Sequence, residues 1–277
     1  MTKGAAFLED RGVARVDGED AAEFLQGLLT NDVARLGAGE ARYAALLSPQ
    51  GKILFDFLVV RAPGEAGAAF LIDCAGAQAG ELARRLGFYK LRAKVAIADA
   101  SAGHGVVAYW GAEPEGASGG LLYADPRARG LGWRAILPRA EAAAVGAAEL
   151  AEYEALRIGL GVPKGGVDFA YGEAFPHDAD MDLLHGVDFE KGCYVGQEIV
   201  ARMRRRGEAR KRVARVTLDG PAPPPGAAVT DGELTVGALG SSSGRSALAL
   251  LRLDRVEAAK AAGRRLTAAG VGIATIE

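Results

Sequence analysis

The sequence has only two cysteines, Cys74 and Cys193, among its 277 residues. It contains neither a C-x-x-C nor an H-x-x-x-H pattern, which excludes the usual spacings of a zinc site. We expect no disulfide between the two thiols in a reducing compartment. A single thiol also cannot hold an iron–sulfur cluster, which usually takes four ligands. Any cluster bound at one of these cysteines would need ligands from a second subunit, a partner or a small molecule.

Long hydrophobic runs and a large excess of one charge are also absent. Apolar residues make up 49% and charged residues 25% of the chain, and the net charge is −2. No apolar run approaches the roughly 18 residues of a membrane-spanning helix. The start of the chain, MTKGAAFLEDRGVARV, lacks the order of a signal peptide. We therefore expect a cytoplasmic protein with no membrane partner, and the net charge disfavours a generally basic nucleic-acid binder.

Turn residues and apolar periodicity predict strands and helices that do not alternate strictly, which indicates an α+β fold. The stretch 161–192 is rich in Gly, Asp and Pro and predicts a long loop of the kind that is often functional. Strands are expected at 13–16, 43–48, 53–60, 68–73, 92–98, 105–110, 121–124 and 132–137, and helices at 21–29, 77–86, 140–159 and 195–206.

The composition changes after residue 210. A proline-rich spacer at 221–225 lies among short strand-like runs that Gly and Ser separate. This pattern is typical of a small β-barrel. We therefore divide the chain into an α+β body, residues 1–210, and a C-terminal β-barrel, residues 211–277. Its strands are expected at 212–218, 234–240, 246–253 and 271–276.

The two cysteines differ in their surroundings. Cys74 ends the apolar run AAFLIDCAG and is expected to be a buried, inert thiol. Cys193 lies in KGCYVGQE, residues 191–198, just before an expected helix. The positive charge of Lys191 and a helix N-terminus both favour a reactive thiolate. On this chemistry alone, an ordinary surface thiol beside a solvated basic helix is the favoured interpretation of Cys193.

A basic run follows the cysteine. Residues 201–215 carry eight positive charges and one negative charge, that of Glu208. Such a run suggests RNA as a partner, but no aromatic residues are interleaved with it, as single-strand binding usually requires. A solvated helix beside an anionic ligand explains the run adequately. Direct nucleic-acid binding is therefore the least favoured interpretation.

The octapeptide KGCYVGQE resembles the signature of the YgfZ family of iron–sulfur maintenance proteins, which are related to the T-protein of the glycine cleavage system. Further stretches agree in the expected order, so that the resemblance covers residues 7 to about 215. It implies two intertwined α+β domains and a C-terminal β-barrel, in a ring-like arrangement around a folate channel. The supporting stretches are RGVARVDGEDAAEFLQGLLTND, LLSPQGKILFDF, FYKLRAKV, YEALRIGLGVP and FPHDADMDLLHGVDF.

The same resemblance implies tetrahydrofolate or a derivative as cofactor. Tyr153 would offer its ring to folate, although a place on the core face of a helix fits its spacing equally well. Burial of an unpaired carboxylate is costly, so Asp56 is expected either near a sheet end or in a polar cleft, and the resemblance makes it a folate-binding residue. Asp180 would accept hydrogen bonds from the pterin, and Arg202, with Lys191, would bind the carboxylates of the tail. The motif residues expected to support Cys193 are Lys191, Gly192, Tyr194, Gly196, Gln197 and Glu198.

The function implied is a folate-binding factor that supports iron–sulfur cluster assembly or repair in client enzymes, including tRNA-modifying ones. Cys193 would act on a cluster that is shared with a carrier or client protein. The alternative is a tetrahydrofolate-dependent aminomethyltransferase or demethylase. Aminomethyltransferases carry a pair of acids where this chain has Phe55-Asp56, and the missing acid counts against that alternative. An RNA-binding protein is the second alternative.

Overall fold

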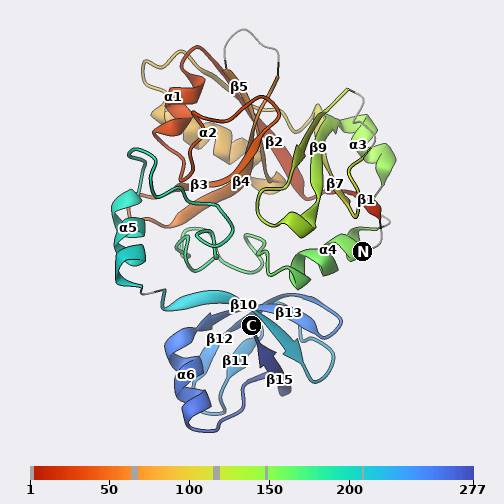
Figure 1. Cartoon of the computed structure of the whole chain (residues 1–277), viewed down its shortest axis with the longest axis vertical. Coiled ribbons are helices and arrows are strands. Elements are labelled where there is room, and N and C mark those ends of the chain that lie inside the picture. Colours follow the sequence, from red (N-terminus) through yellow and green to blue (C-terminus); the bar gives the residue numbers. More distant parts are fainter. Residues whose placement is uncertain (1–2, 64–67, 115–118, 147–148, 208) are drawn as a thin grey trace.

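The computed structural model describes residues 3–63, 68–114, 119–146, 149–207 and 209–277. Two antiparallel sheets form the upper body in Figure 1, and a closed six-stranded barrel lies below them. None of the helices in these ranges combines the length and apolar character that a membrane-spanning helix requires. The expected α+β class with a C-terminal barrel is confirmed.

The five-stranded sheet has the order β3-β4-β5-β2-β6. Its central strands are apolar in sequence because both faces are covered. One face packs against α1 and α2, and the other faces the second sheet. The elements are β2 (Arg11–Gly18), α1 (Ala21–Gln26), β3 (Ala41–Leu47), β4 (Ile53–Arg61), β5 (Ala68–Ala75), α2 (Ala79–Tyr89) and β6 (Ala96–Asp99).

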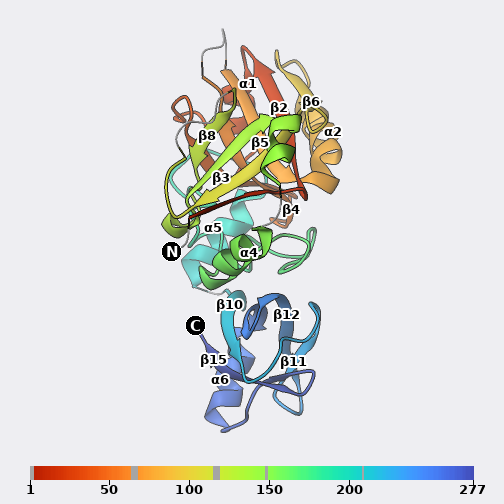
Figure 2. The ribbon, with the colours of Figure 1, turned by 90° about the vertical axis from the view of Figure 1, so that its right-hand side faces the viewer.

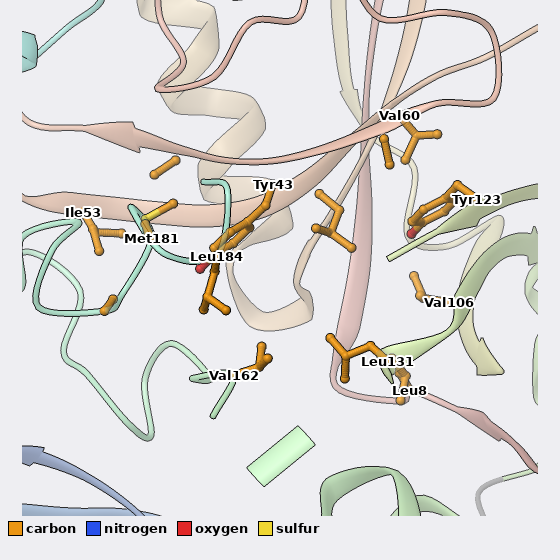
Figure 3. Close-up of a cluster of buried hydrophobic side chains, with 14 of the residues drawn as sticks. Leu8, Tyr43, Ile53, Val60, Val106, Tyr123, Leu131, Val162, Met181 and Leu184 are labelled. Carbon is orange, nitrogen blue, oxygen red and sulfur yellow. The ribbon is translucent and has the colours of Figure 1, made fainter. Parts of the chain in front are cut away.

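The four-stranded sheet has the order β1-β7-β9-β8, with α3 on its outer side. A large apolar core fills the space between the two sheets, and Figure 3 shows Tyr43, Val106 and Tyr123 among its members. The elements are β1 (Gly4–Phe7), β7 (His104–Trp110), β8 (Leu121–Ala124), β9 (Trp133–Pro138) and α3 (Arg139–Val145).

One predicted helix is divided in two. The range 140–159 contains α3 and then α4 (Leu150–Gly159), and residues 147–148 lie outside the described ranges. Gly146 follows α3 with a φ of 76°. Glycine adopts this left-handed conformation without strain, and it ends the helix there. Figure 2 shows α4 between the sheets and the barrel. There Ile158 packs against Val213 and Leu248 of the barrel.

The closed barrel follows α5 (Gln197–Arg206) and has the strand order β10-β13-β12-β11-β14-β15. It has its own apolar core, to which a helix that the sequence did not predict, α6, adds Val256 and Ala259. Its elements are β10 (Lys211–Leu218), β11 (Ala228–Thr230), β12 (Thr235–Ser243), β13 (Ser246–Arg252), α6 (Leu253–Ala261), β14 (Thr267–Ala268) and β15 (Val271–Ile276).

Candidate functional site

Residues 188–196, here called the cysteine loop, connect the long irregular segment to α5. Lys191 anchors this loop from within, being only 7% exposed. Its ammonium group donates hydrogen bonds to the backbone carbonyls of Gln26, Leu29 and Asn31 at 2.6–2.9 Å. Burial lowers the pKa of Lys191 to about 8, against the opposing influence of two nearby acids. Its hydrogen bonds thus fix the loop to the end of α1. This structural role was not expected from the sequence, where the charge of Lys191 suggested only activation of the thiol.

Tyr194 and Gly196 fix the other end of the cysteine loop. Tyr194 is 7% exposed and belongs to the core between the sheets. Gly196 takes a φ of 81° and packs against the β3–β4 turn, where an added Cβ would meet the carbonyl oxygen of Ser48 at 2.6 Å. Both a positive φ and this close approach require glycine. The loop is therefore held at both ends of the Gly192-Cys193 pair.

Gly192 and Cys193 lie between these anchors and are both exposed. A Cβ added to Gly192 would meet no atom within 4 Å. Cys74, in contrast, is 1% exposed, and burial raises the pKa of its thiol to about 12. Both cysteines are free, as expected, and Cys193 is the accessible one.

The remaining motif residues begin α5. Gln197 donates its backbone N–H to the Tyr194 carbonyl at 3.3 Å. Glu198 accepts a hydrogen bond from Arg202 at 2.9 Å, and the side chain of Arg202 is 48% exposed. Arg202 therefore lies on the outer surface of the helix, paired with its own neighbour.

Asp56 and Tyr153, which the sequence separates by nearly a hundred residues, line one small cavity between the two sheets and α4. Asp56 is 5% exposed and accepts hydrogen bonds from the hydroxyls of Tyr43 at 3.0 Å and Tyr171 at 2.6 Å. Of the two positions left open by the sequence, the polar cleft is correct. Tyr153 is both a core residue, 2% exposed, and a wall of this cavity.

Phe55 points away from that cavity. The side chains of a strand alternate between faces, and Phe55 packs into the core beside α1 and α2. An acid at position 55 would therefore face this second core. The cavity therefore lacks no carboxylate because of Phe55. The absence of an acid at position 55 is no longer an argument against transferase activity.

A polar network that the sequence did not reveal makes up the cavity wall. Arg134 donates hydrogen bonds to Asp73, Asp125 and the Tyr153 hydroxyl at 2.6–3.0 Å. Burial alone would raise the pKa of Asp73, but Arg11 and Arg134 outweigh it and hold this pKa below its usual value. The only indication of this network in the sequence is weak: charged residues occur inside otherwise apolar strands. The guanidinium groups that line the cavity are therefore already paired with acidic side chains of the protein.

The cavity is small for a folate. Its volume is about 70 Å³, whereas sites for drug-sized ligands enclose roughly 300 Å³ or more. The Tyr153 hydroxyl is already bonded to Arg134, and a Cβ added to Gly165 would meet the Tyr171 hydroxyl at 2.1 Å. In this conformation the residues lining the cavity do not fit a pterin.

Asp180 lies elsewhere, beside the barrel. Its carboxylate pairs with Arg212 of β10 at 2.8 Å, and the same guanidinium binds Asp182. Burial raises the pKa of Asp180 to about 6, although Arg212 opposes the shift. Nearby His177 is 3% exposed, and neither ring nitrogen has a hydrogen-bond partner among the described residues. The structure thus brings Asp56 and Tyr153 together, but Asp180 and Arg202 each lie apart from them.

Comparison with known proteins places this geometry in a family. Residues 9–120 match the GCVT N-terminal domain, and residues 210–276 match the C-terminal β-barrel domain of CAF17. The iron–sulfur cluster assembly factor IBA57 of Mus musculus is 33% identical over 90% of this chain and 78% of its own length. That of Homo sapiens is 33% identical over 92% and 80%. The chain belongs to the IBA57 family.

Coverage differs among IBA57 relatives. The homolog of Mycosarcoma maydis is 35% identical, but this chain spans only 60% of its length. In fold, the chain is similar to the glycine cleavage system aminomethyltransferase T of Bartonella henselae, with a TM-score of 0.73 and 17% identity over 91% of this chain and 79% of the other. The expected family is therefore correct in its T-protein-like fold, while the relatives carry the IBA57 name rather than that of YgfZ.

The cytoplasmic expectation is wrong by the same comparison. The IBA57 relatives from Mycosarcoma maydis, mouse and human are all named as mitochondrial proteins. The expectation rested on composition and on the first residues, and overall composition does not encode the compartment of a protein.

Proposed function

We propose that this chain supports iron–sulfur cluster assembly or repair and that Cys193 ligates a cluster as cargo. The observation that carries the proposal is the exposed thiol between two buried anchors, Lys191 and Tyr194. A fixed loop presents the sulfur without the entropy cost of ordering a mobile segment at each encounter. The named role of the IBA57 relatives supports the same function.

The cluster would be shared with a carrier or client protein. Iron–sulfur clusters are usually held by four ligands, and the described residues contain no group of three His, Cys, Asp or Glu side chains that could hold a metal ion. Cys193 would therefore supply one thiolate, and the partner would supply the others. Clients that modify tRNA are part of this proposal.

Folate binding is implied by the resemblance alone, and the size of the cavity opposes it. The cavity between Asp56 and Tyr153 has a volume of about 70 Å³, so binding would require its walls to separate. The proposed role of Cys193 therefore does not depend on folate. Transferase chemistry at Asp56 would meet the same limit of space.

A complementation experiment tests the proposed function. Cells that lack their own family member would receive the wild-type chain, Cys193→Ser or the control Cys74→Ser, and the activity of an iron–sulfur tRNA methylthiolation enzyme would be assayed. We expect the wild type and Cys74→Ser to restore activity and Cys193→Ser to fail. Equal rescue by all three, with equal amounts of folded protein, would remove Cys193 from the mechanism.

A further inference from the structure

A groove beside the cysteine loop has no part in the proposed chemistry. Its volume is about 530 Å³, within the range of roughly 300–1,000 Å³ found for ligand sites. It lies between α5 and the stretch from residue 182 to residue 189, which includes the first two residues of the cysteine loop. We call it the basic groove, and its lining residues include Arg42, Asp182, Val187, Asp188, Phe189 and Arg204.

The groove carries unneutralised positive charge. Within the described ranges, no ion pair is formed by Arg42 or Arg204. Of the two acids of the groove, Asp182 is paired with a cation: Arg212 binds both of its oxygens, at 3.0 and 2.8 Å. Asp188 accepts the backbone N–H groups of residues 190 and 191 at 2.7 and 3.0 Å. The two guanidinium groups therefore face one carboxylate that is not paired with a cation among the described residues, that of Asp188, and the remaining excess of positive charge favours an anionic partner.

Apolar surface lies beside these charges. The Phe189 ring packs beneath the guanidinium of Arg204, with 4.1 Å between them. Val187 lines the groove, and Leu183, next to the groove residue Asp182, is 63% exposed. A matching partner would combine carboxylates with aliphatic side chains. A nucleic-acid phosphate backbone would satisfy only the guanidinium groups.

The groove is held in shape by the same region that anchors Lys191. Asn31 donates its side-chain N–H to the carbonyl of His185 at 2.6 Å. The Thr30 hydroxyl donates to the carbonyl of Gly186 at 2.7 Å, and the Thr30 carbonyl accepts the N–H of Asp188 at 2.9 Å. A preformed groove loses little conformational freedom when a ligand binds.

The cysteine lies within short reach of this groove. Phe189 and Cys193 are four residues apart in the chain, and that length spans at most about 14 Å even when fully extended. A segment seated in the groove would therefore bring its protein close to the thiol.

We propose that the basic groove binds an acidic segment, containing aliphatic residues, of the protein that shares the cluster with Cys193. The identity of the partner rests on the proposed function. The presence of the groove and its charge are independent of that function. The segment would pair its carboxylates with Arg42 and Arg204 and place an aliphatic side chain beside Phe189. Docking at the groove would orient the partner before the Cys193 thiolate binds the cluster.

Fluorescence anisotropy with a labelled short peptide tests this groove. The peptide carries two leucines flanked by glutamate and aspartate, and an RNA oligonucleotide of equal charge is the competing probe. We expect peptide binding that weakens about tenfold or more in Arg204→Glu and in Arg42→Glu, since each reversal replaces attraction with repulsion. Arg205→Glu is the matched control, because Arg205 is exposed on the same helix but does not line the groove.

The possible results separate the claims. Tighter binding of RNA, an equal loss in Arg205→Glu, or no peptide binding at about 1 mM, a contact worth only about 4 kcal/mol, would each overturn the groove proposal. Peptide binding should be unchanged in Cys193→Ser, because the thiol does not line the groove. Circular dichroism of each variant confirms that it is folded. A failed complementation by Cys193→Ser together with intact peptide binding would support both proposals independently.

Discussion

Gly196 of the cysteine loop and Gly51 of the β3–β4 turn lie backbone against backbone. Their φ angles are 81° and 78°, and a Cβ added to Gly196 would lie 3.0 Å from the Cα of Gly51. In turn, a Cβ on Gly51 would lie 3.0 Å from that of Ile199 in α5. This glycine contact sets the distance between the hairpin and the helix, and so the position at which Cys193 emerges.

We predict that Gly196→Ala destabilises the protein by about 2–4 kcal/mol, the sum of a left-handed backbone penalty and overpacking. Gly192→Ala is the control, because its Cβ would meet no neighbour, and it should change stability by less than about 0.5 kcal/mol. Urea denaturation of both variants measures the free energy of unfolding. Equal values for the two would contradict the glycine contact as a constraint.

The second prediction concerns the Lys191 anchor. Lys191→Met keeps the aliphatic length but leaves three backbone carbonyls without their donor. Each unsatisfied buried group costs about 1–3 kcal/mol, so we expect a loss of at least 2–3 kcal/mol. Lys90→Met, at an exposed position, is the control. Thermal unfolding of the two variants measures the difference, and a Lys191→Met protein as stable as the control would show that the three bonds contribute nothing.

The third prediction follows from Asp180. Its pKa of about 6 in the folded protein lies above the ordinary value of 3.8 because of burial. Between these values the folded state binds a proton more tightly than the unfolded state. The contribution of Asp180 to the free energy of unfolding is therefore greatest below pH 4 and falls as the pH rises through 6.

Asp180→Asn removes this titration and keeps an oxygen acceptor for Arg212. Asparagine also tolerates the φ of 53° at this position. Relative to the wild type, the variant should gain about 1–3 kcal/mol in free energy of unfolding as the pH rises from 4 to 6.5. Denaturation across this range gives the difference curve. A flat curve would mean that the folded-state pKa is not raised.

The fourth prediction tests folate directly. Because the cavity beside Asp56 and Tyr153 has a volume of about 70 Å³, we expect no saturable binding of tetrahydrofolate at micromolar concentrations by anaerobic calorimetry. Tyr153→Ala enlarges the cavity and serves as the comparison. Saturable binding to the wild type that Tyr153→Ala abolishes would show that the cavity opens, and the folate prediction would then hold.

Local signals in the sequence predicted much of the fold. The hairpin of β3 and β4 follows from Pro49-Gln50-Gly51 between apolar runs. In the barrel, β10, β12, β13 and β15 lie near their predicted positions, whereas the short strands β11 and β14 were not predicted. β1 was missed because four residues carry no periodicity, and its pairing with β7 across about a hundred residues defines it. The strand expected at 92–98 begins only at Ala96, since a turn with Leu91 at a φ of 42° comes first.

The candidate site was predictable in its residues but not in its contacts. KGCYVGQE pointed to Cys193, and the polar neighbours of Cys193 indicated that it lies outside the core. Nothing local to Lys191 reveals that its ammonium group binds carbonyls 160 to 165 residues earlier in the chain. The separation of Asp180 from Asp56 likewise depends on Arg212 in the barrel. Glu208, counted in the basic run, lies outside the described ranges.

Reconstitution of the shared cluster tests the central claim most directly. The purified chain and an iron–sulfur carrier protein would be mixed anaerobically with ferric iron and sulfide, then separated by size-exclusion chromatography with visible absorbance detection. We predict a cluster-containing complex of both proteins with the wild type and with Cys74→Ser, and no such complex with Cys193→Ser. A complex that forms equally well with Cys193→Ser would contradict the role of Cys193 as the shared ligand.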